Sequence, residues 1–277
     1  MATPARRAFS LTGADGGPLR GEIRSGAGAR PAVVICHGFK GFKDWGYFPV
    51  TAERLARAGF AAVSFNFSGS GVGESGDSFD EPERFRRATY SNGLRDLGIV
   101  VAELRRGRLG VQPTSIGVLG HSMGGGIAVL QTAADPGIGA LVTWSATARF
   151  GRLWRKDQIP EWRRTGTIEI VNQRTGERLP LATDILEDLE RNADRLSVLD
   201  AAAMIRAPWL VVHGAADESV PVSDAADLAE RAPQSHLLSI ENAGHTFGIK
   251  HPWSGSTAQF DRVLEASVDW FSRHLVP

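Results

Sequence analysis

The chain has 277 residues, and its 31 basic side chains balance 31 acidic ones, so the formal net charge is zero. A balanced charge gives no global field that attracts nucleic acid or an anionic membrane, and we expect neither as a partner. The single cysteine, Cys36, excludes an intrachain disulfide and a cysteine-rich zinc site. The first residues form no apolar signal segment and no window approaches 18 apolar residues, so we expect a cytoplasmic protein.

Strands and helices are predicted to alternate along the first half of the chain. Residues 6–11 and 19–24 flank Gly13-Ala14-Asp15-Gly16-Gly17 and indicate an antiparallel hairpin. A helix is expected to begin with Asp80 as its N-cap, in Asp80-Glu81-Pro82-Glu83, and to run toward Arg105. Short apolar runs predict further strands, and helical start and stop signals stand between them. These strands are expected at 31–36, 60–67, 115–119 and 139–144, with helices at 49–58 and 123–134.

The alternation is interrupted from Ser145 to about Asp200. Within this segment, residues 167–171 and 177–181 flank Arg174-Thr175-Gly176 and indicate a second hairpin. A structureless loop of this length is unusual in a compact domain, so we interpret residues 145–200 as an inserted cap. The remaining elements are a helix at 184–199 inside the cap, strands at 209–212 and 236–240, a helix at 223–232, and a last helix with an apolar stripe from Phe260 to Phe271.

This order of elements predicts the fold class. Alternating strands and helices are typical of a mostly parallel sheet covered by helices on both faces. We therefore expect an α/β fold, with a core formed by residues 1–144 and 201–277 and the cap as a separate subdomain.

Gly120-His121-Ser122-Met123-Gly124 matches the pattern G-x-S-x-G. The pattern alone is weak, because a glycine-rich chain contains it by chance at a substantial rate. Here a predicted strand leads directly into it and a predicted helix leads out, which is the setting of a nucleophile elbow. The sequence therefore predicts Ser122 as a nucleophile that projects from a sharp strand-to-helix turn.

A serine nucleophile needs a base, and the base needs an orienting group. Asp217 follows one predicted strand and His245 follows the next, which places both at the edge where open α/β sheets carry their sites. The order Ser122, Asp217, His245 is also the chain order of this type of triad. Glu218, beside Asp217, is an alternative orienting group, although Asp217 has the better spacing to Val220-Pro221.

An oxyanion hole takes one backbone N–H from the residue after the nucleophile and another from the loop after an early strand. Met123 supplies the first. His37-Gly38-Phe39-Lys40-Gly41 directly follows the predicted strand at 31–36, and Phe39 is the expected second donor.

Together these segments resemble the α/β-hydrolase superfamily over nearly the whole chain outside the insertion. With the loop after the first parallel strand and a cap after the sixth strand, the chain most resembles bacterial carboxylesterases of the cinnamoyl or feruloyl esterase type. It is also similar to the catalytic domains of prolyl-oligopeptidase-like proteins. The segment Phe65-Asn66-Phe67-Ser68-Gly69 departs from the pattern D-x-R-G of this superfamily, so an ion pair typical of that loop is not expected here.

Two features of the cap have alternative interpretations. Its basic side chains outnumber Asp157 and Glu161 nearby, which indicates either attraction of a carboxylate-bearing or phenolic substrate or a solvated helix face. Trp144, Trp154 and Trp162 either line an aromatic acyl pocket or fasten the cap to the core, and we take Trp144 and Trp154 as candidate substrate contacts. The basic residues are Arg149, Arg152, Arg155, Lys156, Arg163 and Arg164.

The sequence thus predicts a serine hydrolase without metal or cofactor. Its expected substrate is a small-molecule carboxylic ester with a small to medium acyl group, aromatic groups such as feruloyl or cinnamoyl included, cleaved through an acyl-enzyme. The alternatives are a peptidase or amidase, and a non-catalytic binding protein built on the same fold. The oligomeric state is not determined by the sequence.

Overall fold

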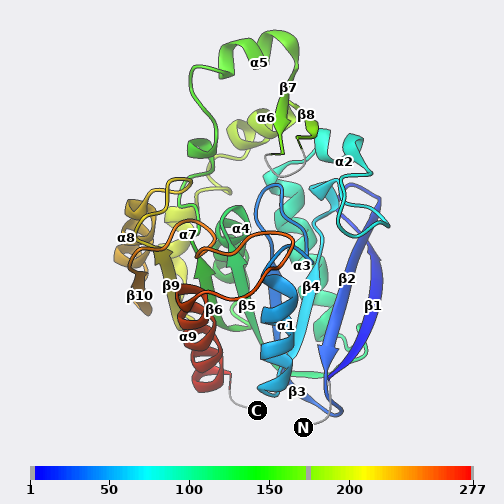
Figure 1. Ribbon diagram of the computed structural model, residues 1–277, viewed down its shortest axis with the longest axis vertical. Helices are drawn as coiled ribbons and strands as arrows, with labels where there is room; N and C mark the ends of the chain where they lie inside the picture. Colours follow the sequence, from blue (N-terminus) through cyan, green and yellow to red (C-terminus); the bar gives the residue numbers. More distant parts are fainter. Residues whose placement is uncertain (1–3, 173–175, 276–277) are drawn as a thin grey trace.

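The computed structural model describes residues 4–172 and 176–275, and its centre is an eight-stranded sheet. The strand order is β1-β2-β4-β3-β5-β6-β9-β10; β1 and β2 are antiparallel to their neighbours, and the other pairs are parallel (Figure 1). The fold class predicted from the sequence is confirmed. The strands are β1 (Ala5–Thr12), β2 (Pro18–Ser25), β3 (Arg30–Cys36), β4 (Ala61–Phe65), β5 (Pro113–His121), β6 (Ile138–Trp144), β9 (Trp209–Gly214) and β10 (Ser235–Ile240).

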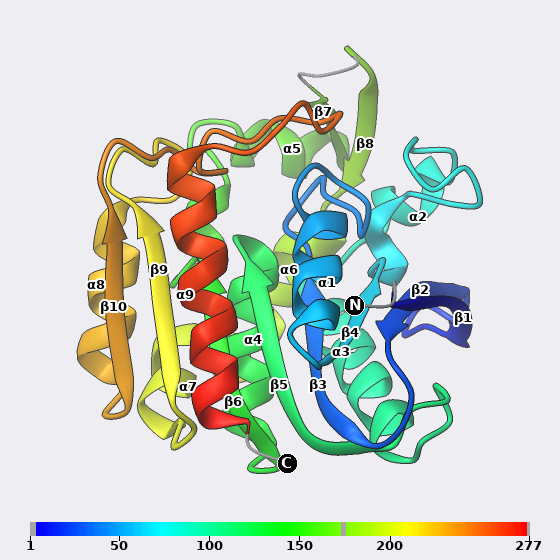
Figure 2. The ribbon, with the colours of Figure 1, turned by 60° about the horizontal axis from the view of Figure 1, so that its bottom comes forward.

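Helices cover both faces of this sheet (Figure 2). One face packs against α1 (Phe48–Arg57) and α9 (Ala258–His274). The other packs against α3 (Tyr90–Arg105), α4 (Met123–Ala134), α7 (Val198–Met204) and α8 (Val222–Arg231).

Strand β3 illustrates why the central strands are apolar throughout. Val33 and Ile35 belong to the core on the side of α1 and α9, whereas Val34 and Cys36 belong to the core on the opposite side. Successive side chains of a strand point to opposite faces, so a strand covered on both sides needs a continuous apolar run. The same parity divides β6, which is important for Trp144 below.

The helix expected from Asp80 to Arg105 is in fact two helices, α2 (Pro82–Arg86) and α3. Thr89 is extended and its side chain accepts a hydrogen bond from the Asn92 amide at 3.2 Å, so it caps a new helix start. Asp80 is not an N-cap. Its carboxylate accepts the Gly73 amide at 2.6 Å and closes the preceding loop instead.

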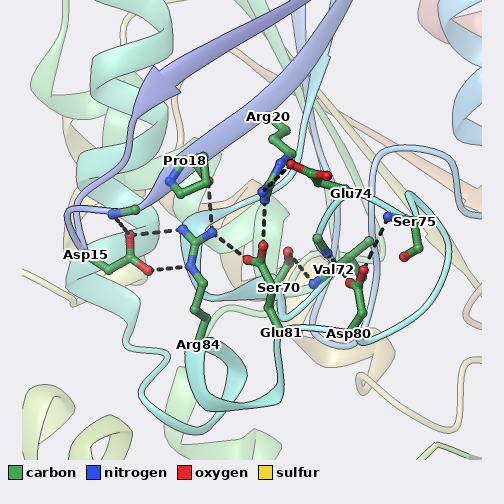
Figure 3. Close-up of polar contacts among 12 residues, drawn as sticks. Asp15, Pro18, Arg20, Ser70, Val72, Glu74, Ser75, Asp80, Glu81 and Arg84 are labelled. Atoms are coloured by element: carbon green, nitrogen blue, oxygen red, sulfur yellow. Dashed lines mark hydrogen bonds and ion pairs between the residues drawn. The ribbon is translucent and has the colours of Figure 1, made fainter.

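The N-terminal hairpin is fastened to α2 by the ion-pair cluster in Figure 3. Arg84 pairs with Asp15 of the hairpin turn at 2.8 Å and with Glu81 at 2.7 Å, and Arg20 of β2 reaches Glu81 at 3.0 Å. Glu81, at the start of α2, therefore binds two arginines. The loop after β4, with its short helix η1 (Ser68–Ser70), lies beside β2.

The inserted cap lies above one end of the sheet, at the top of Figure 1. The predicted hairpin is present as an antiparallel pair, although Arg174 and Thr175 of its turn lie outside the described residues. The expected single helix at 184–199 is divided into α6 and α7. Because α7 packs beside α4 and α8 in the core layer, the part of the chain that lies in the cap ends before α7 begins. Its elements are η2 (Phe150–Leu153), α5 (Ile159–Thr165), β7 (Thr167–Val171), β8 (Arg178–Ala182) and α6 (Asp184–Arg191).

In the part of the chain that the structure describes, no helix is both long and apolar enough to cross a bilayer.

Candidate active site

Ser122 stands at a sharp turn between β5 and α4. Its φ of 56° and ψ of −122° lie outside the ordinary regions for a residue with a side chain. The Ser122 amide donates to the Trp144 carbonyl of β6 at 2.9 Å, while its own carbonyl accepts from Gly125 at 3.0 Å. Strand and helix thus hold the strained backbone from both sides, as in a nucleophile elbow.

The glycines around the serine are required by close backbone approaches. A Cβ on Gly120 would lie 2.4 Å from the Gly124 carbonyl oxygen, and a Cβ on Gly124 would lie 2.2 Å from the His37 carbonyl oxygen. On Gly38, across the site, a Cβ would lie 3.0 Å from Ser122 Cβ. The oxyanion loop after β3 therefore lies directly against the elbow because none of these positions carries a side chain.

The structure brings Ser122, His245 and Asp217 together in hydrogen-bond geometry. His245 Nε2 is 3.0 Å from Ser122 Oγ, and His245 Nδ1 is 2.8 Å from Asp217 Oδ2. Asp217 and His245 come from the loops after β9 and β10, at the same edge of the sheet as the elbow. Glu218, the alternative orienting group, is exposed. With Asp217 on Nδ1, the Nε2 atom faces the serine, which is the arrangement of a nucleophile, its base and an orienting carboxylate.

Asp217 is held as a buried carboxylate. Burial alone would raise the pKa of its carboxyl. Hydrogen bonds from His245 and from the amides of Val220 and Ser219 outweigh this effect and lower the pKa to about 2. The group therefore stays ionised at any pH near neutrality and keeps the His245 Nδ1–H in place.

Three further histidines surround the triad and have structural contacts. His121 Nε2 lies 3.1 Å from the His245 carbonyl oxygen, and burial lowers the pKa of His121 to about 3. His37 links the oxyanion loop to the loop after β4, because its Nε2 accepts the Phe67 amide at 3.1 Å. His213 contacts the Val220 carbonyl at 3.0 Å.

The oxyanion loop forms a turn closed by a hydrogen bond from the Gly41 amide to the Gly38 carbonyl at 3.0 Å. Within the described chain, neither the Phe39 amide nor the Met123 amide donates to another residue. Both N–H groups are thus free to donate to a bound group. Lys40, inside the turn, has a φ of 57°.

Two cavities adjoin this loop. The smaller, of about 30 Å³, is lined by Phe39, Met123, Phe67, Phe85 and, from the cap, Ile185. The larger, of about 250 Å³, lies between the loop and the cap and is lined by Phe39, Trp154, Trp162, Ile168 and Ile170. Lys40 lines both. The floor of the cap and the oxyanion loop therefore form one largely apolar surface around Phe39.

The two tryptophans expected to contact substrate have different places. Trp154 lines the larger cavity and packs edge-on against Phe39, with ring centroids 5.3 Å apart. Trp144 is fully buried on the face covered by α9, and its indole N–H donates to Ser267 at 2.9 Å. Its position contradicts the expected substrate contact, because β6 directs its side chain into the core.

Five arginines of the cap are paired with carboxylates, and two of these carboxylates come from outside the segment. The excess of positive charge that we counted within the segment is therefore balanced in part by carboxylates that this count did not include. Asp224 of α8 is fully buried and accepts the Ala148 amide at 2.8 Å and the Arg152 guanidinium, so it fastens the base of the cap. No short motif in the sequence marks this residue. The pairs are Arg149 with Asp227, Arg152 with Asp224, Arg155 with Asp157, Arg163 with Glu190 and Arg164 with Glu161.

Comparisons with known proteins agree with this fold. The chain is 25% identical over 240 residues to 2,6-dihydropseudooxynicotine hydrolase of Paenarthrobacter nicotinovorans; the match covers 84% of this chain and 58% of that protein's length. Among solved structures, Est1E from Butyrivibrio proteoclasticus with bound ferulic acid has a TM-score of 0.71 at 22% identity, covering 96% of this chain and 98% of the other. Dienelactone hydrolase from Anabaena variabilis has a TM-score of 0.69 at 19% identity, covering 99% and 100%.

A family model matches residues 33–254, which include Ser122, Asp217, His245 and the whole cap. The match extends over most of the chain and ends beyond the last residue of the triad. The chain therefore belongs to the alpha/beta hydrolase family.

Proposed function

We propose that the protein is a serine esterase that cleaves carboxylic esters through an acyl-enzyme. The observation that carries this proposal is the pair of distances at His245, 3.0 Å to Ser122 Oγ and 2.8 Å to Asp217 Oδ2. Separate loops supply these three groups, and hydrogen bonds orient each of them for proton transfer.

In the first half of the reaction, Ser122 Oγ attacks the ester carbonyl carbon while His245 Nε2 takes the hydroxyl proton. The carbonyl oxygen becomes an oxyanion and accepts hydrogen bonds from the Phe39 and Met123 amides. Asp217 stabilises the imidazolium that forms and remains ionised throughout. His245 then gives the proton to the leaving alcohol oxygen, the carbon–oxygen bond breaks, and the acyl group stays on Ser122.

In the second half, water attacks the acyl-enzyme with His245 again as the base. The tetrahedral intermediate occupies the same oxyanion hole, and its collapse returns the proton to Ser122 Oγ and releases the carboxylic acid. Each oxyanion donor of this kind contributes roughly 10²–10³ in turnover. Because both donors are backbone groups, substitution of the Phe39 side chain leaves the donor itself in place.

The cavities favour a small to medium acyl group. A volume of about 30 Å³ beside Met123 is about that of two water sites, whereas the 250 Å³ under the cap accepts a larger group. Phe39 and Trp154 give this larger space aromatic walls, and the similar fold of Est1E with ferulic acid makes an aromatic acyl group a reasonable candidate.

The test is hydrolysis of p-nitrophenyl esters from acetate to decanoate by the parent protein and by Ser122→Ala. We expect turnover by the parent with an optimum at short to medium chains, and loss of turnover in the variant. Equal turnover in both proteins would contradict the assignment of the nucleophile. A parent protein that is inactive on every ester but cleaves the matching p-nitroanilides would instead support an amidase.

A further inference from the structure

Lys40 is a cation that the proposed reaction does not use, although it directly follows the expected oxyanion donor Phe39. Its φ of 57° lies in the left-handed region, where glycine is favoured and a side chain is strained. A glycine would form the same turn without strain. Strained residues of this kind are concentrated at functional sites, so the lysine at this position indicates that its side chain has a function.

The Lys40 side chain has no counterion. In residues 4–172 and 176–275, no ion pair or side-chain hydrogen bond joins Lys40 to another group. The residue is partly buried, and this burial lowers the pKa of its amine. The five cap arginines named above, by contrast, each have a carboxylate partner. A partly buried charge is normally paired, so the amine of Lys40 lacks the partner that its environment demands.

Lys40 also has a position from which it reaches a bound ligand. It lines the cavity of about 30 Å³ and the cavity of about 250 Å³, whose other walls are mainly apolar and aromatic. Arg155 also lines the larger cavity, but its guanidinium is exposed and pairs with Asp157 at 2.7 Å. The unpaired positive charge on this surface is therefore that of Lys40.

The geometry of the triad indicates which part of an ester lies there. His245 must give its proton to the leaving oxygen, so the alcohol part lies on the side of His245. Neither Ser122 nor His245 lines either cavity, and both cavities lie against Phe39, the expected donor to the acyl oxygen, with Met123 in the wall of the smaller one. The cavities therefore belong to the acyl part of the substrate.

We propose that Lys40 is a specificity-determining residue that selects esters whose acyl part carries a carboxylate, such as half-esters of dicarboxylic acids. This inference rests on the proposed esterase function and names its substrate class. The carboxylate would pair with the Lys40 amine, while the apolar walls would hold the carbon chain between the two ends. A charge-assisted contact in such surroundings is stronger than a neutral one.

The test compares monomethyl with dimethyl succinate, glutarate and adipate, with release of acid followed by titration at constant neutral pH. The half-esters are anionic under these conditions, and the diesters are neutral references of the same length. The variant is Lys40→Met, which keeps the Cβ and nearly the length of the side chain and removes the charge. The matched control is Lys156→Met, which removes an exposed cap lysine that lines neither cavity.

We expect the ratio of kcat/KM for half-ester over diester to fall by at least about tenfold in Lys40→Met. In Lys156→Met the ratio should stay within about twofold of the parent value, because water and salt screen the interaction between an exposed charge and the bound ester. Lys40→Arg should retain most of the ratio. An unchanged ratio in Lys40→Met, or an equal fall in the Lys156→Met control, would overturn the proposal while leaving the esterase assignment intact.

A binding measurement separates this proposal from the esterase function. Monomethyl glutarate is titrated calorimetrically into Ser122→Ala and into Ser122→Ala with Lys40→Met. Binding that weakens about tenfold without Lys40, in a protein whose parent cleaves no ester, would support the anion site and refute the reaction. Equal binding by both proteins would refute the anion site.

Discussion

Gly124, in the first turn of α4, offers a steric test of how the elbow and the oxyanion loop fit together. In Gly124→Ala the new Cβ would lie 2.2 Å from the His37 carbonyl oxygen and 2.8 Å from that of Cys36. Cβ atoms in proteins essentially never come closer than 3.0 Å to another heavy atom, so a backbone segment must move by about 0.8 Å. The obstructing atoms are carbonyls, which cannot rotate away as a side chain would.

The displacement separates the two halves of the oxyanion hole. Met123 belongs to the helix that would retreat, and Phe39 belongs to the loop behind His37. A misplacement of about 1 Å in a catalytic arrangement costs about 10²-fold in rate. This corresponds to roughly 2.7 kcal/mol of transition-state stabilisation. The overpacking itself is expected to lower the free energy of unfolding by about 1–3 kcal/mol.

The assay is kcat on p-nitrophenyl acetate, with circular dichroism to establish that the variant is folded. Gly98→Ala is the matched control, because a Cβ there meets only the Gln131 side chain, at 3.4 Å, in the middle of α3. The control should keep the parent kcat and gain about 1 kcal/mol of stability from helix propensity. A folded Gly124→Ala protein with the parent kcat would refute the close coupling of loop and elbow.

Three further changes have expected outcomes. Asp217→Asn removes the carboxylate that fixes the tautomer of the catalytic histidine, so kcat on p-nitrophenyl acetate should fall about 10⁴-fold with little change in KM; retention of a tenth of the activity would contradict the role. Burial lowers the pKa of His121 to about 3 and that of His37 to about 4, from 6.5. As the pH drops below 6.5, both histidines therefore become protonated in the unfolded chain while they stay neutral in the folded protein. The free energy of unfolding should consequently fall between about pH 6.5 and pH 4. The fall is about 1.4 kcal/mol per pH unit and histidine, measured by urea unfolding, and a flat profile would exclude two buried neutral histidines. Asp224→Ala leaves the Ala148 amide without its acceptor, so the free energy of unfolding should drop by about 2–3 kcal/mol, and Asp224→Asn should lose less; equal losses would argue against a carbonyl-type acceptor as the essential group.

Much of the site was predictable because its determinants are local. The elbow requires glycines, a strand and a helix within a few residues of Ser122, and all of these are adjacent in the sequence. Asp217 and His245 were found because each follows an apolar run, and parallel strands bring their carboxyl ends to one edge. The choice of Asp217 over Glu218 rested on spacing alone, and the 2.8 Å contact with His245 agrees with it.

Two of the predictions that were wrong concern long-range placement, and a third concerns a local helix start. The period of two in a strand places Trp144 on the same face of the sheet as Val142. The sequence does not show that α9 covers this face. The positive charge of the cap was counted within the segment, whereas Asp224 and Asp227 lie in a helix some seventy residues away. The division between α2 and α3 depends on the Thr89 cap, which competes locally with Asp80 for the helix start.

The backbone itself distinguishes the two ends of the sheet. At the end where β3, β4 and β5 begin, glycines take the left-handed conformations: Gly28, Gly59 and Gly110. The opposite end also has left-handed glycines, Gly46, Gly71 and Gly248, but the described non-glycine residues with positive φ all lie in its loops: Lys40, Ser122, Ser145, Asn242 and Phe247. Each costs about 1–2 kcal/mol, which is large against a typical net stability of 5–15 kcal/mol. For Ser122 the proposed nucleophile explains the cost, because the turn then needs a hydroxyl where glycine would fit. The same reasoning applied to Lys40 supports the proposed role of its amine in the two cavities that it lines.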